Sequence, residues 1–303
     1  MRWGPACIGI VAAAWLLASQ GLLYSQQTVA NEVPQIQSNA PCPVLDARGE
    51  TPTGPEISVA EVTFSGSLVL PVSEQDQIAD SIKEKAHGTP LDGVRDEALE
   101  RARAGWQDRG YFKAQVTGEA KTLTSSPVSQ RIALSIHVDE GLRYTLRGIT
   151  FKNNKAIEDT EVLRGLFPIT DGDIFSREKI ATGLENLRKA YGELGYINFT
   201  SVPDTTFDDE NKAVSLEIDL DEGKQFYVRS VKVLGLDGAA RQELLRSLPI
   251  KSGQTLTSKA WEMLLLKYDS MLPDCPCRFD EAQHMDEHSG TVAVTLDFRP
   301  CPD

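Results

Sequence analysis

The chain has 303 residues, of which 41% are hydrophobic and 25% are charged, and its formal net charge is −13. This length suits two or three small domains better than a single hydrophobic core. The acidic balance argues against a nucleic-acid-binding surface, because such a surface needs clustered Lys and Arg side chains.

Residues 1–25 have the pattern of a secretory signal peptide. Arg2 precedes an apolar run that ends near Leu23, and small and polar residues follow that run. We therefore expect an exported protein that is cleaved near Ser25, with an uncleaved N-terminal anchor as the alternative. Residues 26–56 contain five prolines, and this composition predicts an extended linker.

From residue 57 onward one pattern occurs three times, with a period of about 80 residues. The three units are predicted to span residues 57–141, 142–223 and 224–303. Each unit opens with a short apolar strand, at residues 62–64, 149–151 and 231–233. Each closes with a strand in which apolar residues alternate with other residues, at 132–138, 214–220 and 292–298. Alternation with a period of two indicates a half-buried strand.

Two helices are predicted between these strands in every unit, and the second helix carries an apolar stripe. In the second unit the stripe consists of Ile180, Leu184, Leu187 and Tyr191. The third unit repeats this spacing with Trp261, Leu265, Tyr268 and Leu272. The first unit keeps Leu99, Ala102 and Trp106 but has Arg95 at the first position. The expected N-cap residues are Asp92, Ser176 and Thr257.

A glycine followed by a tyrosine ends the second helix in the first two units. These pairs are Gly110-Tyr111 and Gly195-Tyr196. Glycine takes a positive φ without steric cost, so both glycines are predicted to be C′ caps, with the tyrosines packing inward. The third unit has Cys275-Pro276-Cys277 at this point.

This order of elements resembles the POTRA domain, the periplasmic repeat of BamA- and TamA-like proteins of outer-membrane barrel assembly and polypeptide transport. A Glu-Gly pair after the last strand of the first two units is part of the resemblance, which covers residues 57–300. The residues that carry it are Phe64, Gly88, Trp106, Gly110, Tyr111, Glu140, Gly141, Phe151, Gly172, Tyr191, Gly195, Tyr196, Glu222, Gly223, Val233 and Gly253. The resemblance implies an α+β fold of three tandem units. Each unit would have a three-stranded mixed sheet with two helices on one face.

The resemblance also implies a function, which is that of a non-catalytic scaffold in the periplasm, associated with the outer membrane. Such a scaffold binds client or partner proteins in outer-membrane protein assembly or transport. The implied partner is an outer-membrane barrel protein, an unfolded outer-membrane client or the barrel-assembly complex, with no nucleic acid. The alternative is an N-terminally anchored adaptor of the cell envelope, of the kind found in division proteins.

An exposed sheet edge can bind an extended peptide through backbone hydrogen bonds. In POTRA domains the second strand is commonly such an edge, which implies edge strands here at residues 112–117, 197–202 and 279–284. The alternative is that each edge is merely solvated. The candidate partner-binding residues on these strands are Phe112, Gln115, Val116, Ile197, Phe199, Val202 and Phe279.

Only three residues follow Pro300, so we do not expect this chain to form a membrane barrel of its own. Three interpretations stay open: a free-standing protein, a partner of a barrel on another chain, or a truncated gene product. The chain would then be associated with the membrane through a partner protein and not through a barrel of its own.

Four cysteines remain after removal of the signal peptide, namely Cys42, Cys275, Cys277 and Cys301. An even number in an exported protein favours disulfides. If the last two strands form a hairpin, Cys275 or Cys277 lies near Cys301, and we predict a disulfide there. Cys42 is left for the remaining thiol or for another chain. A zinc site that adds His284 and His288 is disfavoured, because the two cysteines are spaced too closely.

No catalytic or cofactor-binding motif stands out in the sequence. It contains no P-loop, no G-x-G-x-x-G, no G-x-S-x-G and no H-E-x-x-H. The carboxylate clusters at residues 207–211 and 219–224 are predicted to be solvated turns. We therefore predict that the protein is not an enzyme and that it binds no cofactor and no metal.

Overall fold

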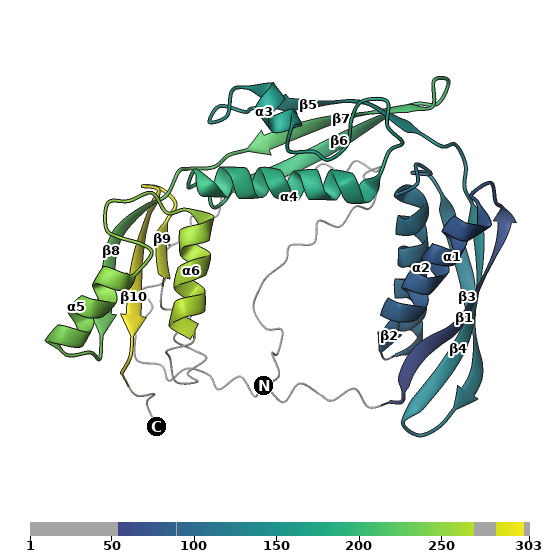
Figure 1. The fold of residues 1–303 in the computed structure, drawn as a ribbon, viewed down its shortest axis with the longest axis horizontal. Helices are drawn as coiled ribbons and strands as arrows, with labels where there is room; N and C mark the ends of the chain where they lie inside the picture. The colour runs from purple at the N-terminus through teal and green to yellow at the C-terminus, as the bar shows by residue number, and fades with distance from the viewer. Residues whose placement is uncertain (1–53, 89, 270–282, 300–303) are drawn as a thin grey trace, which may run out of the picture. The chain divides into compact units, whose positions relative to one another are not determined.

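The computed structural model describes residues 54–88, 90–269 and 283–299, and their strands form three separate sheets (Figure 1). The predicted signal peptide and most of the predicted linker lie outside these residues. So do the four cysteines of the predicted disulfide framework and Phe279.

The first unit is a mixed sheet with two helices on one side (Figure 1). Its elements are β1 (Glu56–Ser67), α1 (Val72–Lys85), β2 (His87–Gly88), α2 (Leu91–Gln107), β3 (Gln115–Ser125) and β4 (Ser129–Asp139). The strand order is β2-β1-β4-β3, with β1 parallel and β3 antiparallel to β4. The sheet therefore has the three predicted strands and in addition the two-residue strand β2, which pairs with the start of β1.

The second and third units repeat this topology with three strands each, in the orders β5-β7-β6 and β8-β10-β9. The elements of the second unit are β5 (Thr145–Lys152), α3 (Thr160–Arg164), α4 (Arg177–Glu193), β6 (Thr200–Asp208) and β7 (Ala213–Asp221). Those of the third are β8 (Tyr227–Leu234), α5 (Gly238–Ser247), α6 (Ser258–Asp269), β9 (Gln283–Asp286) and β10 (Thr291–Asp297). The α+β fold class predicted from the sequence is confirmed.

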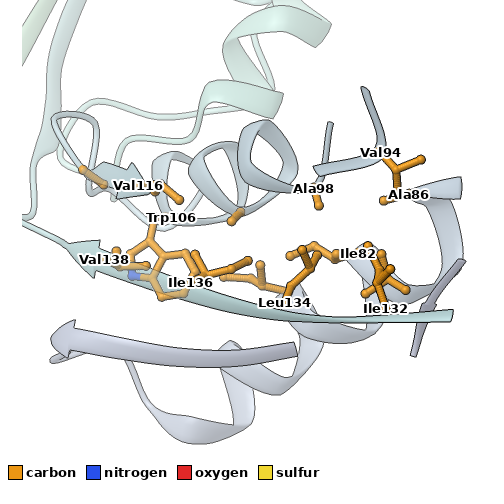
Figure 2. Packing of buried hydrophobic residues seen from close by; sticks show 14 of the residues in the cluster. Ile82, Ala86, Val94, Ala98, Trp106, Val116, Ile132, Leu134, Ile136 and Val138 are labelled. Atoms are coloured by element: carbon orange, nitrogen blue, oxygen red, sulfur yellow. The ribbon is translucent and has the colours of Figure 1, made fainter. Parts of the chain in front are cut away.

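Each unit has a hydrophobic core of its own between its sheet and its helices. In the first unit the alternating residues of β4 supply one side of this core, and Ile132, Leu134 and Ile136 are at most 1% exposed. Figure 2 shows them in a row along β4, with Trp106 of α2 beside Ile136. The period of two read from the sequence therefore builds the core as predicted.

The predicted apolar stripe holds for the second unit and shifts by one residue in the third. Tyr191 of α4 is fully buried. In α6 the buried residue is Leu264, at 1% exposure, whereas Leu265 is only half-buried. The side chain of Tyr268 and all of Leu272 lie outside the described part of the chain.

Two of the three predicted N-caps are confirmed. The Ser176 Oγ accepts a hydrogen bond from the backbone N–H of Lys179 at the start of α4. The Thr257 Oγ1 accepts one from the N–H of Ala260 in α6, at 3.1 Å. In both cases the hydroxyl satisfies a backbone donor that the helix itself leaves free.

The predicted N-cap at Asp92 is wrong, because α2 begins two residues earlier than this N-cap would place it. Pro90 occupies the N-cap position, and Asp92 lies in the first turn. The fixed φ of a proline favours the start of a helix, where the N–H that it lacks is not needed. Asp92 instead forms an ion pair with Arg95 at 3.0 Å.

A buried carboxylate ties the elements of the first unit together. Glu140 follows β4 and is 1% exposed. Its Oε2 accepts a hydrogen bond from the N–H of Val69 at 2.7 Å, and its Oε1 accepts from the N–H of Leu70 at 3.0 Å and from Trp106 Nε1 at 2.8 Å. Glu140 thus joins the end of the sheet to the loop before α1 and to the second helix.

Glu222 has the same role in the second unit. Its Oε1 accepts hydrogen bonds from the N–H groups of Lys155 and Ala156 and from the Tyr191 hydroxyl. Burial raises the pKa of Tyr191, and the hydrogen bond to Glu222 raises it further. The prediction of a solvated turn at residues 219–224 is therefore wrong for Glu222. In the third unit Phe298 follows the last strand in place of a glutamate.

Replacing Glu140 with Ala should destabilise the first unit by about 3 kcal/mol, because two buried N–H donors and one part-buried N–H donor would lose their acceptor. Hydrogen exchange followed by mass spectrometry measures this as faster exchange in α2 and β4, with the other two units unchanged. Glu119→Ala on the exposed side of β3 is the matched control and should change stability by less than about 0.5 kcal/mol. Equal exchange in the two variants would contradict the role assigned to Glu140.

Candidate functional site

Each sheet leaves its second full strand at an open edge, namely β3, β6 and β9. The opposite edges are at least partly covered, in the first unit by β2. In the second unit Thr145 of β5 bridges to Ile174, and in the third Tyr227 of β8 bridges to Thr255. The edge position predicted for the second strand of each unit is therefore confirmed, although β3 and β6 begin three residues later than predicted.

The three edges differ in how well they could pair with another strand. β3 has 11 residues and contains no proline. Its pairing with β4 is unbroken from Gln115 to Thr122, where a bulge follows. β6 contains Pro203, which lacks a backbone N–H and interrupts a hydrogen-bonding edge. β9 has four residues in the part of the chain that the structure describes, so β3 offers the longest regular edge among the described strands.

Three of the predicted contact residues lie on the edge strands. Gln115 is exposed on β3, whereas Val116 is 5% exposed and its side chain points into the core. Val202 lies on β6 and is 67% exposed, next to Pro203. A partner strand paired with β3 would therefore contact the backbone of Val116 and not its side chain.

Three other predicted contact residues, Phe112, Ile197 and Phe199, precede the edge strands, so their assignment to those strands is wrong. β3 begins at residue 115 and β6 at residue 200. Phe199 is 6% exposed, and its ring is stacked on that of Tyr191 at a centroid distance of 4.3 Å. The chain does not enter a strand directly after Gly-Tyr, because these residues are held by packing.

Phe112 and Ile197 form part of the core of the following unit. Phe112 packs against the second core, with its ring 5.2 Å from those of Phe175 and Phe207. Ile197 packs against the third core in the same way. The residue after each Gly-Tyr pair therefore connects two units, and we call residues 108–113 and 193–198 with their contacts joint 1 and joint 2.

The glycine of each joint is required both by its own conformation and by the unit that follows. Gly110 has φ +93° and Gly195 has φ +90°. A Cβ on Gly110 would lie 2.8 Å from Ile174 of the next unit. The carbonyl of Gly110 accepts a hydrogen bond from the N–H of Tyr144 at 2.8 Å, and that of Gly195 accepts one from Phe226 at 2.9 Å. The Gly-Tyr pair thus ends one helix and starts the contact with the next unit.

An acidic residue two positions before each glycine caps a helix of the next unit. The Asp108 Oδ1 accepts a hydrogen bond from the N–H of Glu178 in α4, at 2.7 Å. The Glu193 Oε1 accepts one from the N–H of Lys259 in α6, at 3.3 Å. A carboxylate is favourable at a helix N-terminus, where free N–H groups and the helix dipole attract it. Burial raises the pKa of Asp108, although the N–H of Glu178 acts in the opposite direction.

The polar contacts around the two joints differ in strength. In joint 1, Lys113 Nζ lies 2.8 Å from Asp209 Oδ1, which also accepts a hydrogen bond from the Tyr144 hydroxyl at 2.7 Å. Lys113 and then Tyr144 hold the pKa of Asp209 below its usual value. In joint 2 the corresponding contact is a hydrogen bond of 3.4 Å from Asn198 to Glu287. Asp209, predicted to lie in a solvated turn, therefore binds residues at joint 1.

The described residues can be checked for a metal site and for a membrane-spanning helix. No group of three or more His, Cys, Asp or Glu side chains in residues 54–88, 90–269 and 283–299 is placed to hold a metal ion. His284 and His288 are both exposed. Among the helices of this part of the chain, none is both long and apolar enough to span a membrane.

Comparison with known proteins connects these features to a family. Residues 144–223 match the POTRA family, described as a surface antigen variable number repeat. A putative outer membrane protein assembly factor of Treponema pallidum is 25% identical over 233 residues, covering 73% of this chain and 28% of that protein. The outer membrane protein assembly factor BamA of Neisseria meningitidis is 25% identical over 228 residues, covering 69% and 28%. The chain thus spans 28% of the length of these relatives.

A solved structure extends the likeness to the three units. The POTRA3-5 domains of Haemophilus influenzae BamA align with a TM-score of 0.55, covering 82% of this chain and 98% of that one, at 22% identity. This likeness shows the fold. Together with the family match in the second unit, it confirms the resemblance to POTRA repeats that the sequence indicates.

Replacing Phe112 with Ala should destabilise the second unit by about 2 kcal/mol, although Phe112 directly follows the Gly-Tyr pair of the first. We expect less than for a fully buried phenylalanine, because Phe112 is only half-buried. Hydrogen exchange should become faster in β6 and β7. Val116→Ala, in the core of the first unit, is the control and should act on β3 and β4 instead. Faster exchange confined to the first unit in both variants would rule out the packing assigned to joint 1.

Proposed function

We propose that this chain is a non-catalytic periplasmic scaffold that binds client or partner proteins in outer-membrane protein assembly. It holds an extended segment of the partner at the open edge of β3. The partner is an outer-membrane barrel protein or an unfolded client of the same class, and the chain meets the outer membrane through that partner.

The observation that carries this proposal is the unbroken edge of β3. The edge is free of proline from Gln115 to Thr122, and β3 pairs only with β4 within the described residues. An edge of this kind presents unpaired N–H and C=O groups that an added strand can bind. The POTRA fold and the names of the related assembly factors support the choice of partner class.

The proposal assigns binding to the first unit because the edges of the other two units are less suitable. Val202 on β6 offers an exposed apolar side chain, but Pro203 beside it removes one backbone donor. The four described residues of β9 offer fewer backbone groups than an added strand of ordinary length would use. Phe112 and Ile197 are occupied in the joints and contribute to binding only by fixing where the edge strands begin.

Addition of a urea-denatured outer-membrane barrel protein, diluted into buffer with the full chain, should protect the β3 backbone from hydrogen exchange. We expect slower exchange in residues 115–122, because added strand pairing takes up their free N–H groups. Exchange in β6 and β9 should stay unchanged and serves as the internal control. Binding that leaves the exchange of β3 unaltered would exclude this edge as the site.

A further inference from the structure

Small and charged residues alternate along the open edge of β3. Gly118 and Ala120 pair with Ile136 and Leu134 of β4, whose side chains are in the core. The residue between them, Glu119, and the residue after them, Lys121, are exposed on the face of the sheet away from the helices. The side chains that β3 itself presents to an added strand are therefore small on the core side and charged on the outer side.

Gly118 adds no side chain of its own to the core side of the edge, where Leu99 of α2 lies against it. A Cβ at this position would lie 2.9 Å from Leu99 Cδ2 and 2.8 Å from the Ser135 carbonyl oxygen, so the site accepts only glycine without a shift. Leu99 of α2 is half-buried and packs against the first core. Large side chains on a neighbouring strand, aromatic ones above all, compensate for a glycine in a sheet by covering it. A bulky residue opposite Gly118 would cover both the glycine and the adjoining part of Leu99.

Glu119 and Lys121 have no charged or hydrogen-bonding partner within the described part of the chain. Their cross-strand neighbours on β4 are Ser135 and Ala133, and neither charged group forms a side-chain hydrogen bond or an ion pair there. Opposite charges directly across from each other stabilise a strand pair, and like charges destabilise it. The two side chains therefore distinguish partner strands by the order of their charges.

We propose that the β3 edge selects a partner strand of defined pattern, an inference that rests on the proposed function; the strand is antiparallel, because antiparallel pairing is the more stable of the two directions. Read from its N-terminus, the partner has an acidic residue opposite Lys121 and a large apolar residue opposite Ala120. A basic residue opposite Glu119 and an aromatic residue opposite Gly118 follow. The occupant is thus an extended protein segment in which apolar residues alternate with charged residues of opposite sign.

A second copy of the chain fits this pattern only in part. In an antiparallel pair of two β3 strands centred on Ala120, Glu119 of each copy would face Lys121 of the other. The positions opposite Ala120 and Gly118, where the proposal expects large side chains, would then be occupied by Ala120 and Thr122. Both chains also carry a net charge of −13, which opposes association. A heterologous strand with large apolar residues is therefore the better occupant.

Two synthetic peptides with the same composition test the proposal on the full chain. One carries Asp-Leu-Lys-Phe at its centre, the other Lys-Leu-Asp-Phe, and both have the same Thr-rich flanks. We expect the first to bind about tenfold more tightly, since its charged residues face opposite charges and those of the second face like charges. The double variant Glu119→Lys with Lys121→Glu should reverse this preference. Asp204→Lys on β6 is the control and should leave it unchanged.

The outcomes separate this inference from the proposed function. Equal affinity for both peptides, with protection of residues 115–122, would overturn the charge pattern and leave binding at the edge standing. The charges would then only keep the edge soluble. Peptide binding without protection of β3 would overturn both the inference and the proposed function.

Concentration-dependent dimerisation that blocks peptide binding would show a second copy as occupant and would also overturn the inference. Replacing Phe with Ala in the first peptide should weaken binding. Unchanged affinity would show that the aromatic ring does not pack over Gly118.

Discussion

The arrangement of the chain depends on a glycine in the left-handed conformation at the end of a helix. At Gly110 and Gly195 a side chain would be strained by the positive φ and would also collide with the next unit. With no side chain there, the glycine carbonyl receives the N–H of Tyr144 or Phe226 from the linker that enters the next unit. One residue type therefore ends a helix and fixes where the following unit attaches, and the same geometry occurs twice.

The joints make neighbouring units depend on each other for stability. Asp108 supplies a backbone acceptor at the start of α4, and Phe112 packs against the second core, so the second unit is incomplete without the segment before it. In tandem repeat proteins, stability is approximately a sum of the intrinsic stabilities of the units and the interfaces between neighbours. Joint 1 combines aromatic packing with the Lys113–Asp209 ion pair, whereas joint 2 has a longer hydrogen bond in its place. The two interfaces thus use different contacts, because α4 of the second unit also packs against α6 of the third, and each interface adds its own contribution to the stability of the chain.

The sequence predicts those features that arise from local patterns. Alternating apolar residues gave the core strands, and the position of Gly-Tyr gave the helix ends, because both follow from the conformational preferences of neighbouring residues. The roles of Glu222 and Phe112 depend on partners far away in the sequence. Glu222 looked like part of an acidic turn, although the two backbone N–H groups that donate to it lie 66 and 67 residues away. Phe112 looked like the first residue of a strand. The repetition of an acid two residues before each glycine was visible in the sequence and could have indicated the joints.

The position of the joints also determines which backbone stays available for binding. Phe112 is anchored in the second core, and β3 begins three residues later, at Gln115. The joint contacts use the end of a helix and the segment before the edge strand, so they leave the hydrogen-bonding edge of that strand uncovered. Joining units through the edges themselves would give a continuous sheet but would consume the groups that an added strand needs. The Gly-Tyr joint thus connects the units of this chain while keeping their strand edges free.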